Sequence, residues 1–87
     1  MPDYNGVAVG RVLYALRKER KLSQEALSGL SGITFYRYRR IELGLSVPTF
    51  KMIWELAEVL QLPLEELVRK IILQAEIVAE IRRTLYL

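Results

Sequence analysis

The sequence contains neither cysteine nor histidine among its 87 residues. Without cysteine there is no disulfide and no thiolate chemistry, and without histidine there is no imidazole catalysis and no usual ligand for zinc, copper or haem. Glycine and proline are scarce, with five and three residues, while apolar residues make up 52% of the chain, which excludes a disordered or low-complexity sequence. We therefore expect one small binding domain with no metal and no cofactor, and not an enzyme.

A targeting or membrane-spanning pattern is also missing. The first ten residues lack a basic segment followed by an apolar run. The most apolar stretch, residues 71–81, is interrupted by Gln74, Glu76 and Glu80 and is too short to cross a bilayer. These features predict a soluble, cytoplasmic protein with no membrane partner and no evident small-molecule substrate.

Positive charge is unevenly distributed along the chain. The net charge is +3, but residues 11–40 hold eight basic and two acidic residues, whereas residues 41–87 hold five basic and seven acidic ones. A basic half indicates a polyanionic partner such as nucleic acid. A solvated basic face without a ligand explains the same distribution, so charge alone leaves both interpretations open.

Helical periodicity and capping residues predict an all-α chain of five helices. Apolar residues at helical spacing predict a first helix over residues 7–20 and a long last helix over residues 64–84. Residues suited to cap the three helices between them are Ser23, Thr34 and Thr49, and glycines suited to end helices are Gly32 and Gly44. The residues expected to face the core are Val9, Val12, Leu13, Leu16, Ala26, Leu27, Leu30, Tyr38, Ile41, Phe50, Ile53, Leu56, Ala57 and Leu60.

The segment 22–44 has a pattern typical of nucleic-acid binding. Two short helices, each capped by a hydroxyl residue, are joined by a tight turn at residues 31–33, which is the layout of a helix-turn-helix. The second helix of such a pair enters the major groove of DNA, which is about 12 Å wide. Here that helix begins FYRYRR, and three arginines with three aromatic residues indicate an anionic or flat partner. Two packed helices without a ligand are the alternative from spacing alone.

Short motifs at fixed spacings cover residues 7–69. They are Leu16-Arg17, Leu22-Ser23-Gln24-Glu25, Gly32-Ile33-Thr34, Ile41-Glu42-Leu43-Gly44, Pro48-Thr49, Leu56-Ala57 and Leu64-Glu65-Glu66-Leu67. With these motifs the chain resembles the Cro/phage-repressor family of helix-turn-helix regulators, the xenobiotic-response-element type. The resemblance implies a five-helix, repressor-type domain that binds double-stranded DNA, here followed by a long C-terminal helix.

The resemblance also implies roles for single residues. The implied DNA-binding residues are Gln24, Thr34, Phe35, Tyr36, Arg37, Arg39 and Arg40. Gln24 would touch a phosphate and brace a recognition residue, and Thr34 would cap the recognition helix and reach a phosphate. Phe35, Tyr36 and Arg40 would face base edges, with the other two arginines beside them; Arg40 is the first candidate for a bidentate contact to guanine. Arg17 and Glu42 would form a buried ion pair between the first and third helices.

Some residues depart from the family pattern. Phe35 and Tyr36 stand where small or polar residues are usual, and Phe35 is suited either to a thymine methyl group or to a protein partner. Tyr38 replaces the usual aliphatic residue and is expected in the core, with its hydroxyl at the edge. Gln61 and Pro63 replace the usual glycine and serine before the last helix, which leaves the geometry of that turn open.

The last helix continues beyond the part that resembles the family. We therefore expect a DNA-binding domain over residues 1–69 and a dimerisation extension over residues 70–87. Residues three and four apart form a seam with one polar position: Leu64, Leu67, Ile71, Gln74, Val78, Ile81 and Leu85. The residues expected to contact a second copy are Gln74, Val78, Ile81, Leu85 and Tyr86. A helix folded back along its own domain explains the same seam.

Together these features favour a sequence-specific transcription regulator, in the form of a dimeric repressor. A two-fold dimer places its recognition helices about 34 Å apart and so binds a palindromic operator. An antitoxin and a restriction–modification controller fit the same features. A protein-interaction module on this scaffold is the alternative outside DNA binding, and the aromatic residues Phe35 and Tyr36 favour it.

Overall fold

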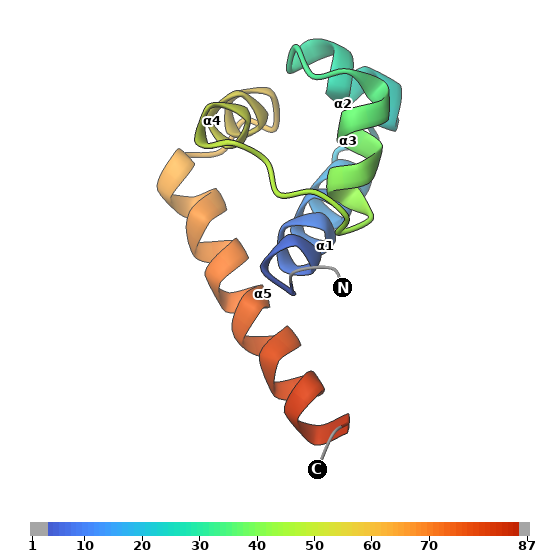
Figure 1. The fold of residues 1–87 in the computed structure, drawn as a ribbon. Helices are drawn as coiled ribbons and strands as arrows, with labels where there is room; N and C mark the ends of the chain where they lie inside the picture. Colours follow the sequence, from blue (N-terminus) through green and yellow to red (C-terminus); the bar gives the residue numbers. More distant parts are fainter. Residues whose placement is uncertain (1–3, 86–87) are drawn as a thin grey trace.

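The computed structural model describes residues 4–85, which form five helices and no strand (Figure 1). The helices are α1 (Tyr4–Glu19), α2 (Gln24–Leu30), α3 (Phe35–Glu42), α4 (Phe50–Val59) and α5 (Leu64–Leu85). The predicted all-α architecture with a long C-terminal helix is confirmed. None of these helices is long and apolar enough to cross a membrane.

The starts of α2, α3 and α4 follow from their capping residues. The side-chain oxygens of Ser23, Thr34 and Thr49 each accept a hydrogen bond from the backbone N–H three residues later, at 3.0–3.2 Å. Each bond satisfies a backbone donor that the first turn of a helix leaves without a partner. The predicted starts of these three helices are therefore correct.

Each of the helices α1 to α4 is followed by one residue in the left-handed backbone conformation. The residues with positive φ at these ends are Lys21 (57°), Gly32 (68°), Gly44 (78°) and Gln61 (58°). After α4, the N–H of Gln61 donates to Glu58 and the N–H of Leu62 donates to Ala57, both at 3.1 Å. Glycine is favoured in this left-handed conformation, but Gln61 adopts it as well. The turn before α5 therefore keeps the helix-ending geometry without the family's glycine.

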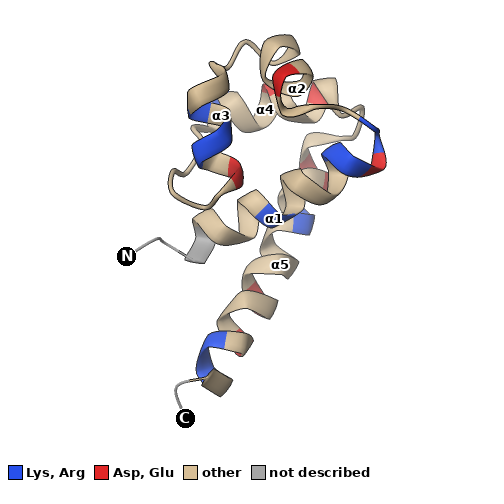
Figure 2. Ribbon diagram, turned by 90° about the vertical axis from the view of Figure 1, so that its right-hand side faces the viewer, with Lys and Arg blue, Asp and Glu red and all other residues tan. Residues whose placement is uncertain are grey.

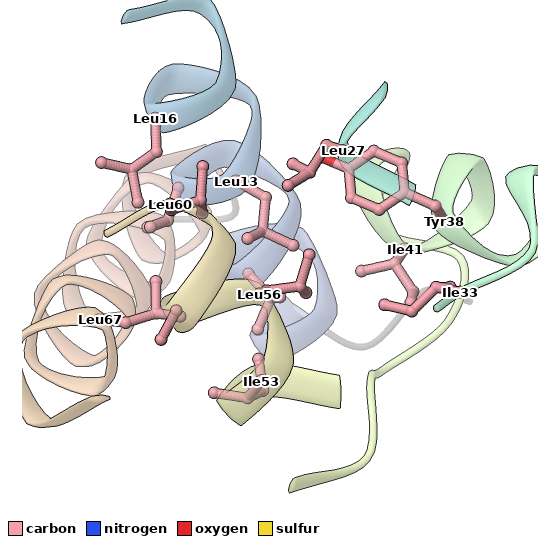
Figure 3. Packing of buried hydrophobic residues seen from close by; sticks show 13 residues of the cluster. Leu13, Leu16, Leu27, Ile33, Tyr38, Ile41, Ile53, Leu56, Leu60 and Leu67 are labelled. Carbon is pink, nitrogen blue, oxygen red and sulfur yellow. The ribbon is translucent and has the colours of Figure 1, made fainter. Parts of the chain in front are cut away.

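The core lies between α1, the α2–α3 pair, α4 and the first half of α5 (Figure 3). Its fully buried large side chains are Leu13, Leu27, Tyr38, Ile41, Leu56, Leu60 and Leu67. The prediction of a core position was wrong for two residues, because Leu30 is 67% exposed and Phe50 is 65% exposed. Leu30 is the last residue of α2, where the chain turns away. Phe50 is the first residue of α4, and its ring packs edge to face on Trp54, with centroids 5.9 Å apart.

The first helix begins at Tyr4, three residues earlier than predicted. The apolar pattern begins at Val7, but the preceding Gly6 already packs against the turn after α3. A Cβ at Gly6 would lie 3.2 Å from the carbonyl oxygen of Gly44. Glycine packs here through its backbone and adds no apolar side chain to the periodic pattern. Periodicity therefore could not predict this first turn of the helix.

The long helix α5 packs along α1, and its C-terminal turns extend beyond the other helices (Figure 1). Val78 is only 7% exposed, and Gln74 lines the space between the two helices. The expectation that Val78 lies on a free dimer face is therefore corrected, because this side chain faces its own domain, whereas Gln74 is only partly buried. Periodicity identified the apolar seam, but the seam covers α1 up to Val78. Ile81 and Leu85 are exposed, and Tyr86 lies outside the described residues.

Candidate nucleic-acid interface

The core contacts of α3 determine which of its side chains face outward. Tyr38 and Ile41 are completely buried, so the opposite side of this helix carries Tyr36, Arg39 and Arg40. Tyr36 is 73% exposed and Phe35, at the edge of this surface, is 40% exposed. The turn between α2 and α3 contains Gly32 at a φ of 68°. We call the outward side of α3, with Phe35, Tyr36, Arg37, Arg39 and Arg40, the recognition surface.

Basic residues lie on the recognition surface and at the ends of other helices. In Figure 2 basic positions lie on α3, across the molecule on the C-terminal end of α1 and the turn that follows it, and also on α5. The last turn of α3 contains Arg39 and Arg40, and that of α1 contains Arg17 and Lys18. Cations at a helix C-terminus are stabilised by the helix dipole. Basic residues at these helix ends are therefore favoured both by the helix dipole and by a polyanionic partner.

The three arginines of α3 differ in what they contact. The Nε of Arg40 donates a hydrogen bond of 3.4 Å to the hydroxyl of Ser46, and the Arg40 guanidinium lies 5.9 Å from the centroid of the Tyr36 ring. The guanidinium groups of Arg37 and Arg39 contact no partner among residues 4–85. Thr34, at the start of α3, accepts the backbone N–H of Arg37 and is exposed.

A buried polar network ties this helix to the rest of the domain. The Glu42 carboxylate, at the end of α3, accepts hydrogen bonds from Arg17 Nη2 at 2.7 Å and Arg17 Nε at 3.0 Å. It also accepts the hydroxyl of Tyr38 at 2.5 Å and the amide Nε2 of Gln24 at 3.2 Å. Arg17 Nη1 donates to the carbonyl oxygen of Leu22 at 3.0 Å. The structure thus brings Arg17 and Glu42 together, and it places Gln24 beside them.

The protonation states in this network follow from its contacts. Burial opposes ionisation of Glu42, but hydrogen bonds from Arg17, Tyr38 and Gln24 outweigh it and lower the pKa of this carboxyl group. The hydrogen bond to Glu42 raises the pKa of Arg17. Burial, reinforced by the neighbouring carboxylate, raises the pKa of Tyr38. Glu42 is therefore ionised and Tyr38 is a neutral donor at physiological pH.

Sequence reasoning missed two contributions to this region. The Tyr38 hydroxyl was expected at the edge of the core, but it bonds Glu42 inside the network. Ser46 was not among the predicted site residues, although its hydroxyl accepts a hydrogen bond from Arg40 Nε. Gly44 was the available signal, because a left-handed glycine after a helix turns the chain back along that helix. Among the described residues there is no cluster of acidic side chains suited to a metal ion.

Comparisons with known proteins agree with this geometry. A helix-turn-helix family model matches residues 13–67. The crystal structure of the clp gene regulator ClgR from Corynebacterium glutamicum superposes with a TM-score of 0.84 at 12% identity, covering 99% of this chain and 92% of that one, which shows a shared fold. A search among curated proteins gives no significant match. Because the family model spans more than half of the chain, the protein belongs to the Cro/C1-type helix-turn-helix family of DNA-binding transcription regulators.

Proposed function

We propose that the protein is a homodimeric repressor that inserts α3 into the major groove of each half of a palindromic operator. The recognition surface carries this proposal. It combines three arginines with no acidic side chain, and it lies opposite the two residues that anchor α3 in the core. An arginine can donate two hydrogen bonds to guanine, and arginines also neutralise phosphates.

Each residue of the recognition surface has a role suited to its chemistry. Arg40 contacts a guanine, Arg37 and Arg39 contact phosphates, and the apolar edges of Phe35 and Tyr36 contact thymine methyl groups. Thr34 caps α3 and reaches a phosphate. Gln24 uses one amide hydrogen for Glu42 and keeps the second for a phosphate.

The proposed dimer face lies between α1 and α5. Leu73, Ile77 and Ile81 follow one another at four-residue spacing along one edge of α5, and each is about half exposed. The first two line a groove of about 250 Å³ together with Ala15 of α1. Apolar side chains in a row at such a groove favour a second copy of the chain over water. Dimerisation through residues 70–87 is thus proposed for the edge of α5 that borders this groove.

Replacing Arg40 by alanine tests the DNA contact. A randomised duplex pool should yield a palindrome with the wild-type protein. We expect Arg40→Ala to lose about 1–3 kcal/mol of discrimination at one base pair of each half-site while binding random duplexes almost as well as the wild type. The measurement is competition binding at fixed salt. Arg69→Ala, which removes the same charge from α5, is the matched control and should keep the preference. An equal loss on every duplex would instead place Arg40 on the DNA backbone.

Replacing Ile77 by aspartate tests the dimer face. A carboxylate at the centre of an apolar contact has no partner there, so we expect Ile77→Asp to sediment as a monomer at concentrations where the wild type is a dimer. Ile72→Asp is the control, because Ile72 is equally exposed but lies on the other edge of α5. If Ile72→Asp dissociates the dimer and Ile77→Asp does not, the dimer uses that other edge.

A protein-interaction module is the second candidate, favoured by the exposure of Phe35 and Tyr36. The two functions differ in their response to salt. A DNA-binding protein that contacts several phosphates loses affinity for random DNA steeply as salt is added. Absence of DNA binding even at low salt would favour a protein partner for the recognition surface.

A further inference from the structure

Arg40 differs from the other arginines of α3 in that its guanidinium makes two side-chain contacts. The centroid of the Tyr36 ring, one helical turn earlier, lies 5.9 Å from the guanidinium carbon of Arg40. The hydroxyl of Ser46 accepts a hydrogen bond from Arg40 Nε at 3.4 Å. Arg37 and Arg39 have no such contact with residues 4–85. Arg40 is also partly buried, whereas these two arginines are exposed.

The turn after α3 brings Ser46 to this position. The N–H of Leu45 donates to the carbonyl oxygen of Arg40 at 2.9 Å, and the N–H of Gly44 donates to that of Ile41 at 3.0 Å. This pair of bonds folds the chain back over the last turn of the helix. Gly44 is also pressed against α1, since a Cβ there would lie 3.0 Å from the side chain of Val7. The loop that carries Ser46 is thereby fixed by the packing of α1.

We propose that Ser46 is a positioning residue that orients Arg40 for specific base recognition, so that Arg40 determines specificity. The inference rests on the proposed DNA-binding function and deepens it. Ser46 takes the Nε–H, which leaves both terminal nitrogens of Arg40 for O6 and N7 of a guanine. An arginine already ordered loses less rotamer freedom when it binds, and this favours a geometrically demanding base contact. The two unrestrained arginines suit phosphates, which accept hydrogen bonds from many directions.

A double-mutant cycle tests the positioning role. Competition binding compares the selected operator with one altered at the base pair whose preference Arg40→Ala removes. We expect Ser46→Ala to reduce discrimination at that base pair by about two- to tenfold, the range for loss of one hydrogen bond. Ser46→Thr keeps the hydroxyl and should retain the preference. The double variant Arg40→Ala/Ser46→Ala should discriminate no worse than Arg40→Ala, because Ser46 acts through Arg40. Affinity for random duplexes should stay unchanged.

Two results would overturn the proposal. An equal loss for all duplexes with Ser46→Ala would make Ser46 a contact to the DNA backbone, and a loss of discrimination that adds to that of Arg40→Ala would mean that Ser46 acts independently of Arg40. In the free protein, NMR exchange of the Arg40 Nε–H should be slower than that of Arg37 and should become equally fast in Ser46→Ala; equal rates in the wild type would refute the contact itself. Failure of the wild type to bind any duplex at low salt would refute the proposed function, and base recognition by Arg40 with it.

Discussion

Replacing Glu42 by glutamine is expected to destabilise the protein by about 3–5 kcal/mol. Glutamine has nearly the same shape but no charge, so the guanidinium of Arg17 would remain buried without its counter-ion. Burying an unpaired charge costs far more than an exposed ion pair contributes. Domains of this size have total stabilities on the order of 5–10 kcal/mol, so this loss would leave a large fraction unfolded in mild denaturant.

Urea unfolding followed by circular dichroism, at one protein concentration, measures this effect. Glu76→Gln, on the exposed side of α5, removes the same charge and should change the stability by no more than about 0.5 kcal/mol. The double variant Arg17→Met/Glu42→Gln should be more stable than the sum of its single changes predicts, because it removes the orphaned charge. A loss below about 1 kcal/mol for Glu42→Gln alone would contradict a buried, tightly coupled pair.

The Glu42 carboxylate also makes the stability of the protein depend on pH. Its pKa is lowered in the folded protein, so the unfolded chain binds a proton more readily and stability falls as the pH falls. The contribution of Glu42 is complete above the ordinary glutamate pKa of about 4.3 and is lost as the pH decreases through the lowered value. The stability difference between the wild type and Glu42→Gln should therefore shrink on going from neutral pH into this acidic range.

Replacing Gly10 by alanine is expected to destabilise the fold by at least about 1–3 kcal/mol. A Cβ at this position would lie 2.4 Å from the carbonyl oxygen of Glu42 and 2.9 Å from that of Ile41. Both neighbours are backbone atoms at the end of α3, so relief requires α1 and α3 to move apart. That movement would also stretch the bonds from Arg17 to Glu42. The higher helix propensity of alanine, worth up to about 1 kcal/mol, offsets only part of this cost.

Gly29→Ala is the matched control for this prediction. A Cβ at Gly29 has no neighbour within 4 Å, and the residue lies inside α2. Alanine there should raise the stability by about 0.4–1 kcal/mol, since it reduces the freedom of the unfolded chain. Thermal unfolding of both variants gives the comparison. If Gly10→Ala unfolds at the same temperature as Gly29→Ala, α1 and α3 are not in the close contact described above.

Much of this fold could be predicted because its signals are local. The hydroxyl caps Ser23, Thr34 and Thr49 act within one turn of helix, and the burial of Tyr38 and Ile41 follows from their spacing. Periodicity identifies an apolar seam but not the element that covers it, and so Val78 was assigned to a second copy of the chain although it is buried in its own domain.

The remaining features depend on contacts between distant residues or on helix ends. Leu30 and Phe50 fit an apolar pattern but stand at ends of helices that reach past the core. Gly10 carries no pattern at all, although it sets the approach of α1 to α3. Ser46 reaches Arg40 only because of the turn between them. The residues of the recognition surface could thus be predicted from the sequence, but the contact of Ser46 with Arg40 could not.

The position of α1 between α3 and α5 has a consequence for the DNA. On one side α1 is joined to α3 through the Glu42 network and the Gly10 contact, and on the other side it packs against α5. In a dimer formed along α5, the two copies of α3 are then connected through packed helices and not through a flexible linker. Such a dimer would hold its two recognition helices at a fixed distance and angle. One extra base pair between the half-sites turns one of them by about 34–36° around the duplex axis, and the packed path from α3 through α1 to α5 resists that rotation.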